Sequence, residues 1–508
     1  MASKQAQPQA PRETRYVRLG DLQPDPRNPK AHDVELIDTS IGRFGIIDQI
    51  AVDGLNDIAS ALRERLLAPL ESDPDFWTFA ADSRRTMGHA FFNYPAMMVP
   101  QVQGALLDLW IASDPHHRLI LDPFAGSGTV MTEAMMRGLD FRGVDINPLA
   151  ILLLKVKARP LAGPTLANAL TKVLAAVDGD KRTSKLDFRG REKWFNDSVA
   201  VQLTRLHRGI AALPGRDVRR FFWVCLAATV RRVSNSRTST FKLHTYSTDV
   251  LDSRVIDTLK EFKEVATENI AHAVAQRQAL IDSELLTSSG HYKGRISHQL
   301  VDVRSIKSRT ATPGADLLMT SPPYGDNRTT VSYGQYAFLP LKWIDPADLD
   351  GGDRLVDLIE NPYRTDVASL GGRPGAEMVD QLVELGERSD SVREVSKLLK
   401  DVPGDGLRRF GAFVCDLDEA MRKINTQLRP GAFQFWTLGE RSIASHRIPT
   451  TRIVAELATA QGCTEVVTLT RSIPNGRKRM AIRNDRGSTI RSETILVMQS
   501  SSEGSPRG

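Results

Sequence analysis

The stretch that decides the fold is HRLILDPFAGSGTVMTEAMMRGLDFRGVDI, residues 117–146. An apolar run is followed by a glycine-containing turn, and then by a segment, residues 129–138, with the apolar spacing of a helix. A second apolar run ends at Asp145. A strand, a turn, a helix and a second strand in this order are typical of a parallel sheet with helices on both faces. The sequence therefore predicts an α/β protein with a Rossmann-like, doubly wound sheet.

The same stretch predicts a site for an adenosine-containing cofactor. Gly126 and Gly128 allow the backbone to approach a ligand at the start of a helix. Asp122 and Asp145 follow the two apolar runs, and an acidic residue at the second strand end of such sheets binds ribose hydroxyls. The turn lacks the G-x-G-x-x-G spacing, and no Walker-type motif occurs around it. At this point the choice between a dinucleotide and S-adenosylmethionine stays open.

A second motif offers acceptors for an amino group. ADLLMTSPPYGDN, residues 315–327, places Ser-Pro-Pro-Tyr after a buried strand, at the edge where open α/β sheets bind ligands. Pro322 and Pro323 have no backbone N–H, so this turn presents carbonyl oxygens and few donors. Ser321 Oγ and the Pro322 carbonyl can accept from an exocyclic amine, and the Tyr324 ring can stack on its base. We expect such acceptors to localise the lone pair of the amine for a direct group transfer, without a metal or covalent intermediate.

Composition excludes several classes of protein. A chain of 508 residues is long for a single binding module and predicts roughly three units. The three cysteines, Cys225, Cys415 and Cys463, lie far apart in apolar surroundings, which predicts core residues and no disulfide framework or close-spaced zinc site. No apolar run approaches the roughly 18 residues of a membrane helix, and the first 15 residues lack the apolar core of a signal peptide. We expect a cytoplasmic protein with no membrane partner.

Positive charge is concentrated in one part of the chain. Residues 181–242 contain 15 Lys and Arg against 4 Asp and Glu, whereas the net charge of the whole chain is +6. A local excess of this kind is typical of a surface that binds a polyanion, and the alternative is a solvated helical face. Core packing is expected for Phe221, Phe222 and Trp223. The basic residues expected to bind DNA are Arg219, Arg220, Arg231, Arg232, Arg237 and Lys242.

Together these motifs resemble those of the S-adenosylmethionine-dependent amino-methyltransferases of DNA. FAGSG, residues 124–128, matches the cofactor motif, Asp145 the ribose position and SPPY, residues 321–324, the catalytic motif. NYPAMMVP, residues 93–100, is similar to the segment that closes over the methionine end of the cofactor, and Asp302 to the residue that faces the adenine amino group. The resemblance covers about residues 91–498, apart from two insertions.

The resemblance implies a mostly parallel seven-stranded sheet and methyl transfer from S-adenosyl-L-methionine to the exocyclic amine of a base flipped out of double-stranded DNA. Serine before Pro-Pro-Tyr favours N4 of cytosine over N6 of adenine. The catalytic residues are then Ser321, Pro322, Pro323 and Tyr324. The cofactor residues are Tyr94, Pro95, Asp122, Pro123, Phe124, Ala125, Gly126, Ser127, Gly128, Thr129, Asp145, Ile146 and Asp302.

Ahead of this domain, LQPDPRNPKAHD (residues 22–33) and SIGRFGIIDQIAVDG (residues 40–54) resemble the front half of the ParB-like N-terminal domain. GLNDIASALRERLLAPL stands where that family has a Gly/Arg-rich box that contacts phosphate, so we expect a small α+β segment used for docking or DNA contact. The predicted segments are a disordered leader (1–14), the partial ParB-like segment (15–70), the cofactor-binding half of the methyltransferase domain (71–150), a basic helical insertion as candidate target-recognition region (151–290), the catalytic half (291–344), a polar insertion (345–408), the C-terminal strands and helices (409–500) and a disordered tail (501–508).

Other interpretations stay open. An adenine-N6 DNA methyltransferase or an RNA amino-methyltransferase would use the same acceptors, and a catalytically inactive scaffold would only bind DNA. A second basic stretch, residues 471–491, is either a solvated hairpin tip or a further DNA contact. Tyr333 and Trp343 are candidates for the wall of the base pocket, with core packing as the alternative for Trp343. A restriction or defence nuclease is a candidate partner.

Overall fold

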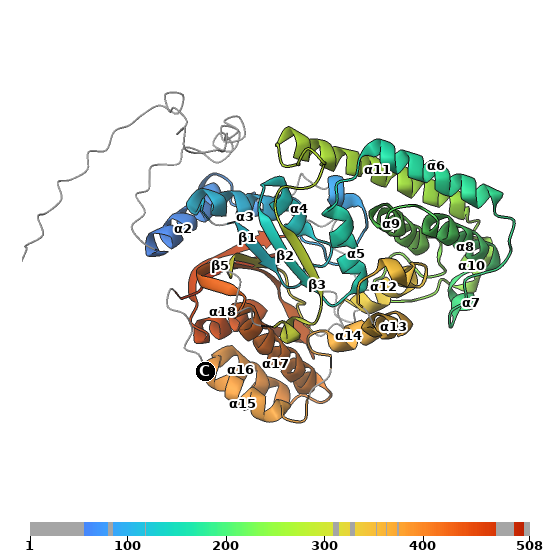
Figure 1. Cartoon of the computed structure of the whole chain (residues 1–508). Coiled ribbons are helices and arrows are strands. Elements are labelled where there is room, and N and C mark those ends of the chain that lie inside the picture. The colour runs from blue at the N-terminus through green and yellow to red at the C-terminus, as the bar shows by residue number, and fades with distance from the viewer. Residues whose placement is uncertain are drawn as a thin grey trace, which may run out of the picture. The chain divides into compact units, whose positions relative to one another are not determined.

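Seven strands in the described part of the chain form one sheet, in the order β3-β2-β1-β4-β5-β9-β8 (Figure 1). They are β1 (Leu119–Asp122), β2 (Asp140–Asp145), β3 (Ile296–Leu300), β4 (Ala315–Thr320), β5 (Leu428–Gly439), β8 (Thr464–Ser472) and β9 (Ser492–Gln499). The pairs β3/β2, β2/β1, β1/β4 and β4/β5 are parallel, and β9 is antiparallel to both β5 and β8. The predicted mostly parallel, seven-stranded sheet of a Rossmann-like methyltransferase fold is confirmed.

The computed structural model describes residues 55–79, 85–116, 118–307, 314–325, 331–351, 353–361, 363–372, 375–473 and 492–501. The expectations for the leader, for the ParB-like segment before residue 55, for most of the basic loop 471–491 and for nearly all of the tail lie outside these residues. Within the described ranges, every helix is too short or too polar to cross a membrane.

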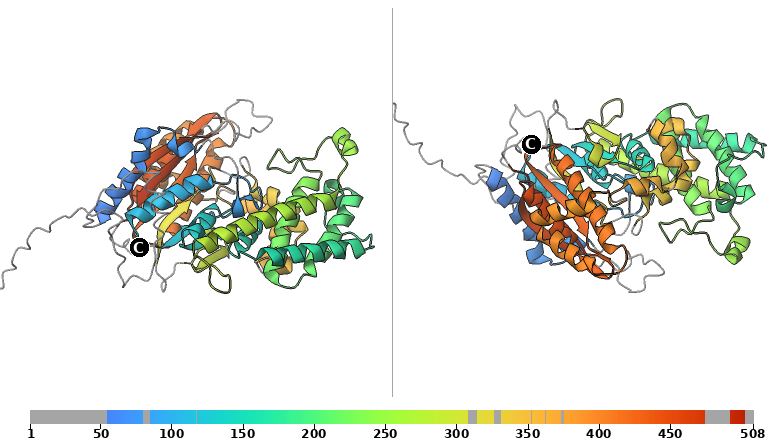
Figure 2. Two further views of the ribbon diagram at one scale, coloured as in Figure 1. Left: turned by 90° about the horizontal axis from the view of Figure 1, so that it is seen from above. Right: turned by 90° about the horizontal axis from the view of Figure 1, so that it is seen from below.

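Both faces of the sheet are covered by helices. One face has α2 (Leu55–Ser72), α3 (Pro100–Ser113) and α4 (Thr129–Met136), and the other has α17 (Gly406–Asn425) and α18 (Thr450–Ala460) (Figure 2). After residue 409, the described elements include α17, β5, α18, β8 and β9, in this chain order. A two-stranded hairpin, β6 (Arg441–Ile443) and β7 (His446–Ile448), follows β5.

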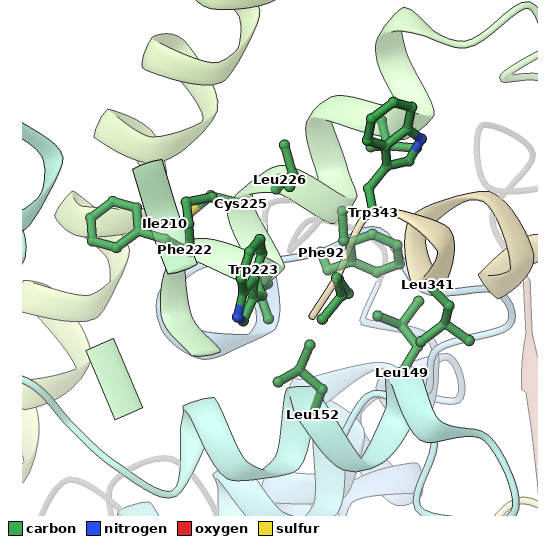
Figure 3. Packing of buried hydrophobic residues seen from close by; sticks show 14 of the residues in the cluster. Phe92, Leu149, Leu152, Ile210, Phe222, Trp223, Cys225, Leu226, Leu341 and Trp343 are labelled. Carbon is green, nitrogen blue, oxygen red and sulfur yellow. The ribbon is translucent and has the colours of Figure 1, made fainter. Parts of the chain in front are cut away.

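The long segment between β2 and β3 is helical, as predicted. It contains α5 (Pro148–Lys157), α6 (Gly163–Gly179), α7 (Arg191–Trp194), α8 (Asp197–Ala211), α9 (Arg216–Val233), α10 (Thr248–Ser253) and α11 (Thr258–Asp282). Phe221, Phe222 and Trp223 are at most 3% exposed, which confirms that they pack in the core. Phe222 and Trp223 of α9 belong to one buried cluster with Leu149 and Leu152 of α5 and with Leu341 of α12 (Tyr333–Lys342), and Figure 3 labels these five side chains.

Helices also fill the region between β4 and β5. They are α12 (Tyr333–Lys342), α13 (Asp353–Glu360), α14 (Arg364–Ala368), α15 (Met378–Arg388) and α16 (Asp390–Lys400). Four short 3₁₀ turns complete the described elements: η2 (Phe76–Thr78), η3 (Met87–Ala90), η4 (Val303–Ser305) and η5 (Pro346–Asp348). Residues 345–408 therefore include amphipathic helices, and Leu382, Val395 and Leu399 lie buried in the core with α17.

Candidate active site

The turns that follow β1 and β4 open into one cavity. These strands are parallel neighbours, with Ile120 opposite Leu317 and Leu121 opposite Leu318, so their carboxyl ends lie at the same edge of the sheet. The cavity has about 820 Å³ of empty volume, including solvent at its mouth. The predicted residues that line it are Tyr94, Pro95, Pro123, Phe124, Ala125, Gly126, Ser127, Thr129, Asp145, Ile146, Asp302, Ser321 and Pro323.

Asp145 holds the glycine turn in place. Its Oδ2 accepts a 2.8 Å hydrogen bond from Gly126 N, and its Oδ1 accepts one of 2.8 Å from Asn147 N. Burial raises the pKa of this carboxyl to about 6. Gly128 lies behind the cavity wall at the start of α4, with φ +75°, and a Cβ there would be 2.6 Å from Leu154 Cδ2. Gly126 also has a positive φ, +48°, so both glycines have the left-handed backbone conformation that favours glycine.

Asp122 lies beneath the cavity and joins the two motifs. Its Oδ1 accepts hydrogen bonds from Thr320 Oγ1 at 2.6 Å and from Phe124 N at 3.1 Å. The residue is fully buried, and burial raises the pKa of its carboxyl to about 7. Within the described residues, Oδ2 of Asp122 is buried without a hydrogen-bond partner.

Asn147 supports one side wall, and the sequence analysis missed it. Its Nδ2 donates to Tyr94 Oη at 2.9 Å and to the Tyr333 carbonyl at 3.4 Å. The Tyr94 and Tyr333 rings are stacked, with centroids 5.8 Å apart and planes at 24°. Asn147 also caps α5, because its Oδ1 accepts from Leu149 N, and the Asn-Pro start of that helix is the signal that could have identified it. Tyr333, a candidate for the wall of the base pocket, lines the cavity.

Helix α14 and the two residues after it, from the predicted polar insertion, form another wall, and no sequence signal placed them there. Thr365, Ala368, Ser369 and Leu370 line the cavity. Arg304 holds this segment beside Asp302.

Arg304 forms three contacts at this wall. Its Nη2 donates to Asp302 Oδ2 at 2.7 Å and to the Ala368 carbonyl at 2.8 Å, and its guanidinium also pairs with Asp416. The wall therefore depends on residues from three separate parts of the chain.

Ser321 and Tyr324 begin a hydrogen-bonded chain that leaves the cavity. Ser321 Oγ donates to Tyr324 Oη at 3.2 Å, and Tyr324 Oη donates to Glu493 Oε1 at 3.2 Å. The Tyr324 ring packs against Gly439, where a Cβ would be 2.5 Å from two ring carbons. Tyr324 and Pro322 are not among the residues that line the cavity, and the sequence analysis missed Glu493.

Trp343 lies in the core rather than at the cavity. It is fully buried, and the rings of Phe188 and Phe195 meet it edge-on at 5.6 and 5.2 Å. The core-packing alternative holds for this residue.

Three of the basic residues expected to bind DNA contact η5 and α12. Arg219 forms two hydrogen bonds, of 2.7 and 2.8 Å, with the carboxylate of Asp348, and Arg220 Nε donates to the Asp348 carbonyl. The Arg231 guanidinium lies 4.1 Å from the centroid of the Tyr336 ring. These contacts hold α9 against α12 and η5.

The other three basic residues lie at or near the end of α9. Arg232 is 45% exposed and faces Glu261 and Glu268, and Arg237 Nε donates to the Thr245 carbonyl. Lys242 is part of a loop whose Leu243 N donates to Gln335 Oε1 on α12. This loop therefore lies against the helix that begins with Tyr333 at the cavity.

No protein-family model matches the chain. A similar protein is the type II methyltransferase M.MvaI of Kocuria varians, which is 27% identical over 462 residues. The match covers 88% of this chain and 98% of that protein. The chain thus resembles a type II methyltransferase over most of its length. Because so little of the chain is left out, the match runs through much of the segments 151–290 and 345–408.

Proposed function

We propose that the protein is a site-specific, S-adenosylmethionine-dependent DNA methyltransferase that modifies the exocyclic amine of a flipped base, with N4 of cytosine favoured over N6 of adenine. One observation supports this most strongly: Gly126 and Ser321, from the two predicted motifs, line the same cavity at adjacent strand ends. The similarity to a type II methyltransferase supports the same conclusion. A cytoplasmic location and a restriction nuclease as partner belong to this proposal.

The lining of the cavity fits the cofactor. Asp145 and Asp302 supply carboxylate oxygens, which accept from hydroxyl and amino groups, and Phe124 and Met97 supply apolar surface. Asp145 Oδ2 accepts from Gly126 N and Oδ1 accepts from Asn147 N. A carboxylate offers about four acceptor positions, so this one can also accept from ribose hydroxyls. When bound, S-adenosylmethionine supplies a methyl group on a sulfonium.

The acceptors after β4 act on the base. Ser321 Oγ and the Pro322 carbonyl accept from the two N–H groups of the amine, and this draws its hydrogens out of the plane of the ring. The lone pair of the nitrogen then leaves conjugation and points at the methyl group. We assign to Tyr324 the stacking contact with the extruded base. Rate acceleration comes from positioning and electrostatics.

The DNA duplex is assigned to the basic side of the helical insertion. Arg232, Arg237 and Lys242 are the residues for phosphate contact. Arg237 and Lys242 belong to the loop that lies against α12 beside the cavity, and Arg232 is in the last turn of α9 before that loop. Arg219, Arg220 and Arg231 support that surface from inside.

A methylation assay with tritiated S-adenosylmethionine on duplex DNA and on tRNA tests the proposal, and mass spectrometry of the digested nucleosides identifies the product. Label in DNA as N4-methylcytosine is the expected result. N6-methyladenine in DNA would correct the target base, and label in tRNA alone would make the protein an RNA amino-methyltransferase. Absence of label, with no heat of cofactor binding by calorimetry, would leave a DNA-binding scaffold.

A further inference from the structure

A series of hydrogen-bonded side chains links the cavity to an ion pair between β8 and β9. From Ser321 it passes through Tyr324 to Glu493, and Glu493 pairs with Arg471, its cross-strand neighbour on β8. Because β9 runs antiparallel to β5, its first residues lie beside the end of β5, with Glu493 opposite Gly439. The topology therefore brings an acid from the start of one strand to the edge where other strands end.

Arg471 is fixed from three sides. Its side chain is 3% exposed, its Nε donates to the Trp77 carbonyl at 2.9 Å and its Nη2 donates to the Thr78 carbonyl at 3.3 Å. The remaining nitrogen, Nη1, meets Glu493 Oε2. A guanidinium has donors only, so it holds the carboxylate as an acceptor.

The ion pair sets the direction of both hydrogen bonds between Ser321, Tyr324 and Glu493. Since Glu493 only accepts, the Tyr324 hydroxyl must give its single hydrogen to Glu493. The Tyr324 oxygen can then only accept, so the Ser321 hydroxyl hydrogen points to Tyr324. Because this bond uses only the hydrogen of the Ser321 hydroxyl, both lone pairs of Ser321 Oγ stay free to accept, and Ser321 lines the cavity.

We propose that Glu493, held by Arg471, is a positioning residue that keeps Ser321 Oγ an acceptor toward the target amine. This rests on the proposed function, because an N–H donor on the substrate is what the acceptor serves. Gly439 belongs to the same arrangement, since any side chain there would displace the Tyr324 ring.

Two variants and a control test the proposal. Glu493→Gln keeps the size of the side chain but adds an N–H donor. The direction in which Ser321 and Tyr324 donate their hydroxyl hydrogens is then no longer fixed. Tyr324→Phe removes the middle hydroxyl and keeps both the ring and the Glu493–Arg471 pair. Glu465→Gln is the matched control. It removes an exposed carboxylate at the start of β8, away from Ser321, Tyr324 and Glu493.

We expect kcat to fall about 10²-fold in Glu493→Gln and in Tyr324→Phe, the size of effect that a displaced catalytic group produces. The KM for DNA and the calorimetric Kd for S-adenosylmethionine should stay within about twofold. The double variant should lose no more than either single variant, because both remove the same constraint. Protein labelled at tyrosine Cζ and free of cofactor gives an independent NMR measurement: the Tyr324 resonance, assigned by its loss in Tyr324→Phe, should shift in Glu493→Gln and not in Glu465→Gln.

Wild-type kcat in a folded Glu493→Gln, or losses that multiply in the double variant, would overturn the positioning role. If Glu493→Gln does not fold, wild-type kcat in Tyr324→Phe would overturn it instead. An unmoved Tyr324 resonance would refute the hydrogen-bonded chain itself. If the resonance moves but the wild type methylates no nucleic acid, the proposed function fails together with the positioning role, and the chain of hydrogen bonds stands.

Discussion

Thr320 Oγ1 donates a 2.6 Å hydrogen bond to Asp122 Oδ1, and this bond joins the carboxyl ends of β4 and β1. The acceptor is a buried carboxyl with a pKa of about 7, because burial outweighs the two hydrogen bonds that favour its charged form. The link between the turns after β1 and β4 therefore contains a group that changes charge near neutral pH.

Asp122→Asn should stabilise the protein increasingly as the pH rises from 5 to 7. The folded state binds the Asp122 proton more tightly than the unfolded state does, so charging this carboxyl lowers stability between its unfolded and folded pKa values. The free energy of unfolding of the variant, relative to that of the wild type, should rise by up to about 1.4 kcal/mol per pH unit and become constant above about pH 7.5. Urea unfolding at pH 5, 6, 7 and 8 measures it, and a difference that does not change with pH would contradict the prediction.

Gly128→Ala should lower the free energy of unfolding by about 1–2 kcal/mol, because φ is +75° there and the new Cβ would meet Leu154 Cδ2 at 2.6 Å. Gly179→Ala is the control, since a Cβ at that position meets nothing within 4 Å. Denaturant titration of both variants checks the difference. Equal stability of the two would mean that the turn can relax.

Arg304→Gln should weaken S-adenosylmethionine binding about tenfold. The change releases Asp302 and the Ala368 carbonyl, so the wall of residues 365–370 loses its anchor. Arg452→Gln, an exposed site on α18, should leave the affinity unchanged. Calorimetry with the cofactor compares the two, and equal affinities would exclude this wall from the cofactor site.

Tyr324→Ala should reduce turnover by about 10²-fold or more while the cofactor Kd changes less than about twofold, because the ring is assigned to the base. Tyr363→Ala, at an exposed tyrosine, is the control. Turnover is measured with saturating cofactor and duplex DNA. Undiminished turnover would remove Tyr324 from the base pocket.

Arg219→Ala should lower the stability of the protein, whereas Arg232→Ala should weaken its binding to DNA. Losing Arg219 leaves the buried carboxylate of Asp348 short of its main partner and should cost about 1–3 kcal/mol of stability. Losing Arg232 should leave Tm unchanged, weaken DNA binding and reduce the salt dependence of that binding. Thermal unfolding and fluorescence anisotropy with a labelled duplex separate the two, and unchanged DNA affinity in Arg232→Ala would move the DNA surface elsewhere.

Short-range sequence patterns predicted where the strands end and which turns follow them. The apolar runs before Asp122, Asp145 and Ser321 each end at the carboxyl edge of a parallel strand, because a buried strand followed by a Gly or Pro turn has few other conformations. Most of the predicted motif residues therefore line one cavity, and the others lie next to it in the same two turns. Their individual roles stay predictions.

What the sequence could not predict depends on contacts between distant segments. Arg219 is paired with Asp348, which follows it by more than a hundred residues, and nothing in the α9 pattern distinguishes this pairing from an exposed basic face. Glu493 is the second residue of β9 and precedes the apolar run of that strand, so in the sequence it looks like any surface acid at the start of a buried strand. Only the antiparallel direction of β9 places it at the site.

The strand order has a consequence for the growing chain on the ribosome. Among the described strands, β8 pairs with β9 and with no other, and β9 is synthesised after β8 but lies between β5 and β8 in the sheet. Until residues 492–499 have left the exit tunnel, β5 presents an unpaired edge to its surroundings. During synthesis this edge is a place where a chaperone, or another nascent copy, could bind before the sheet is complete.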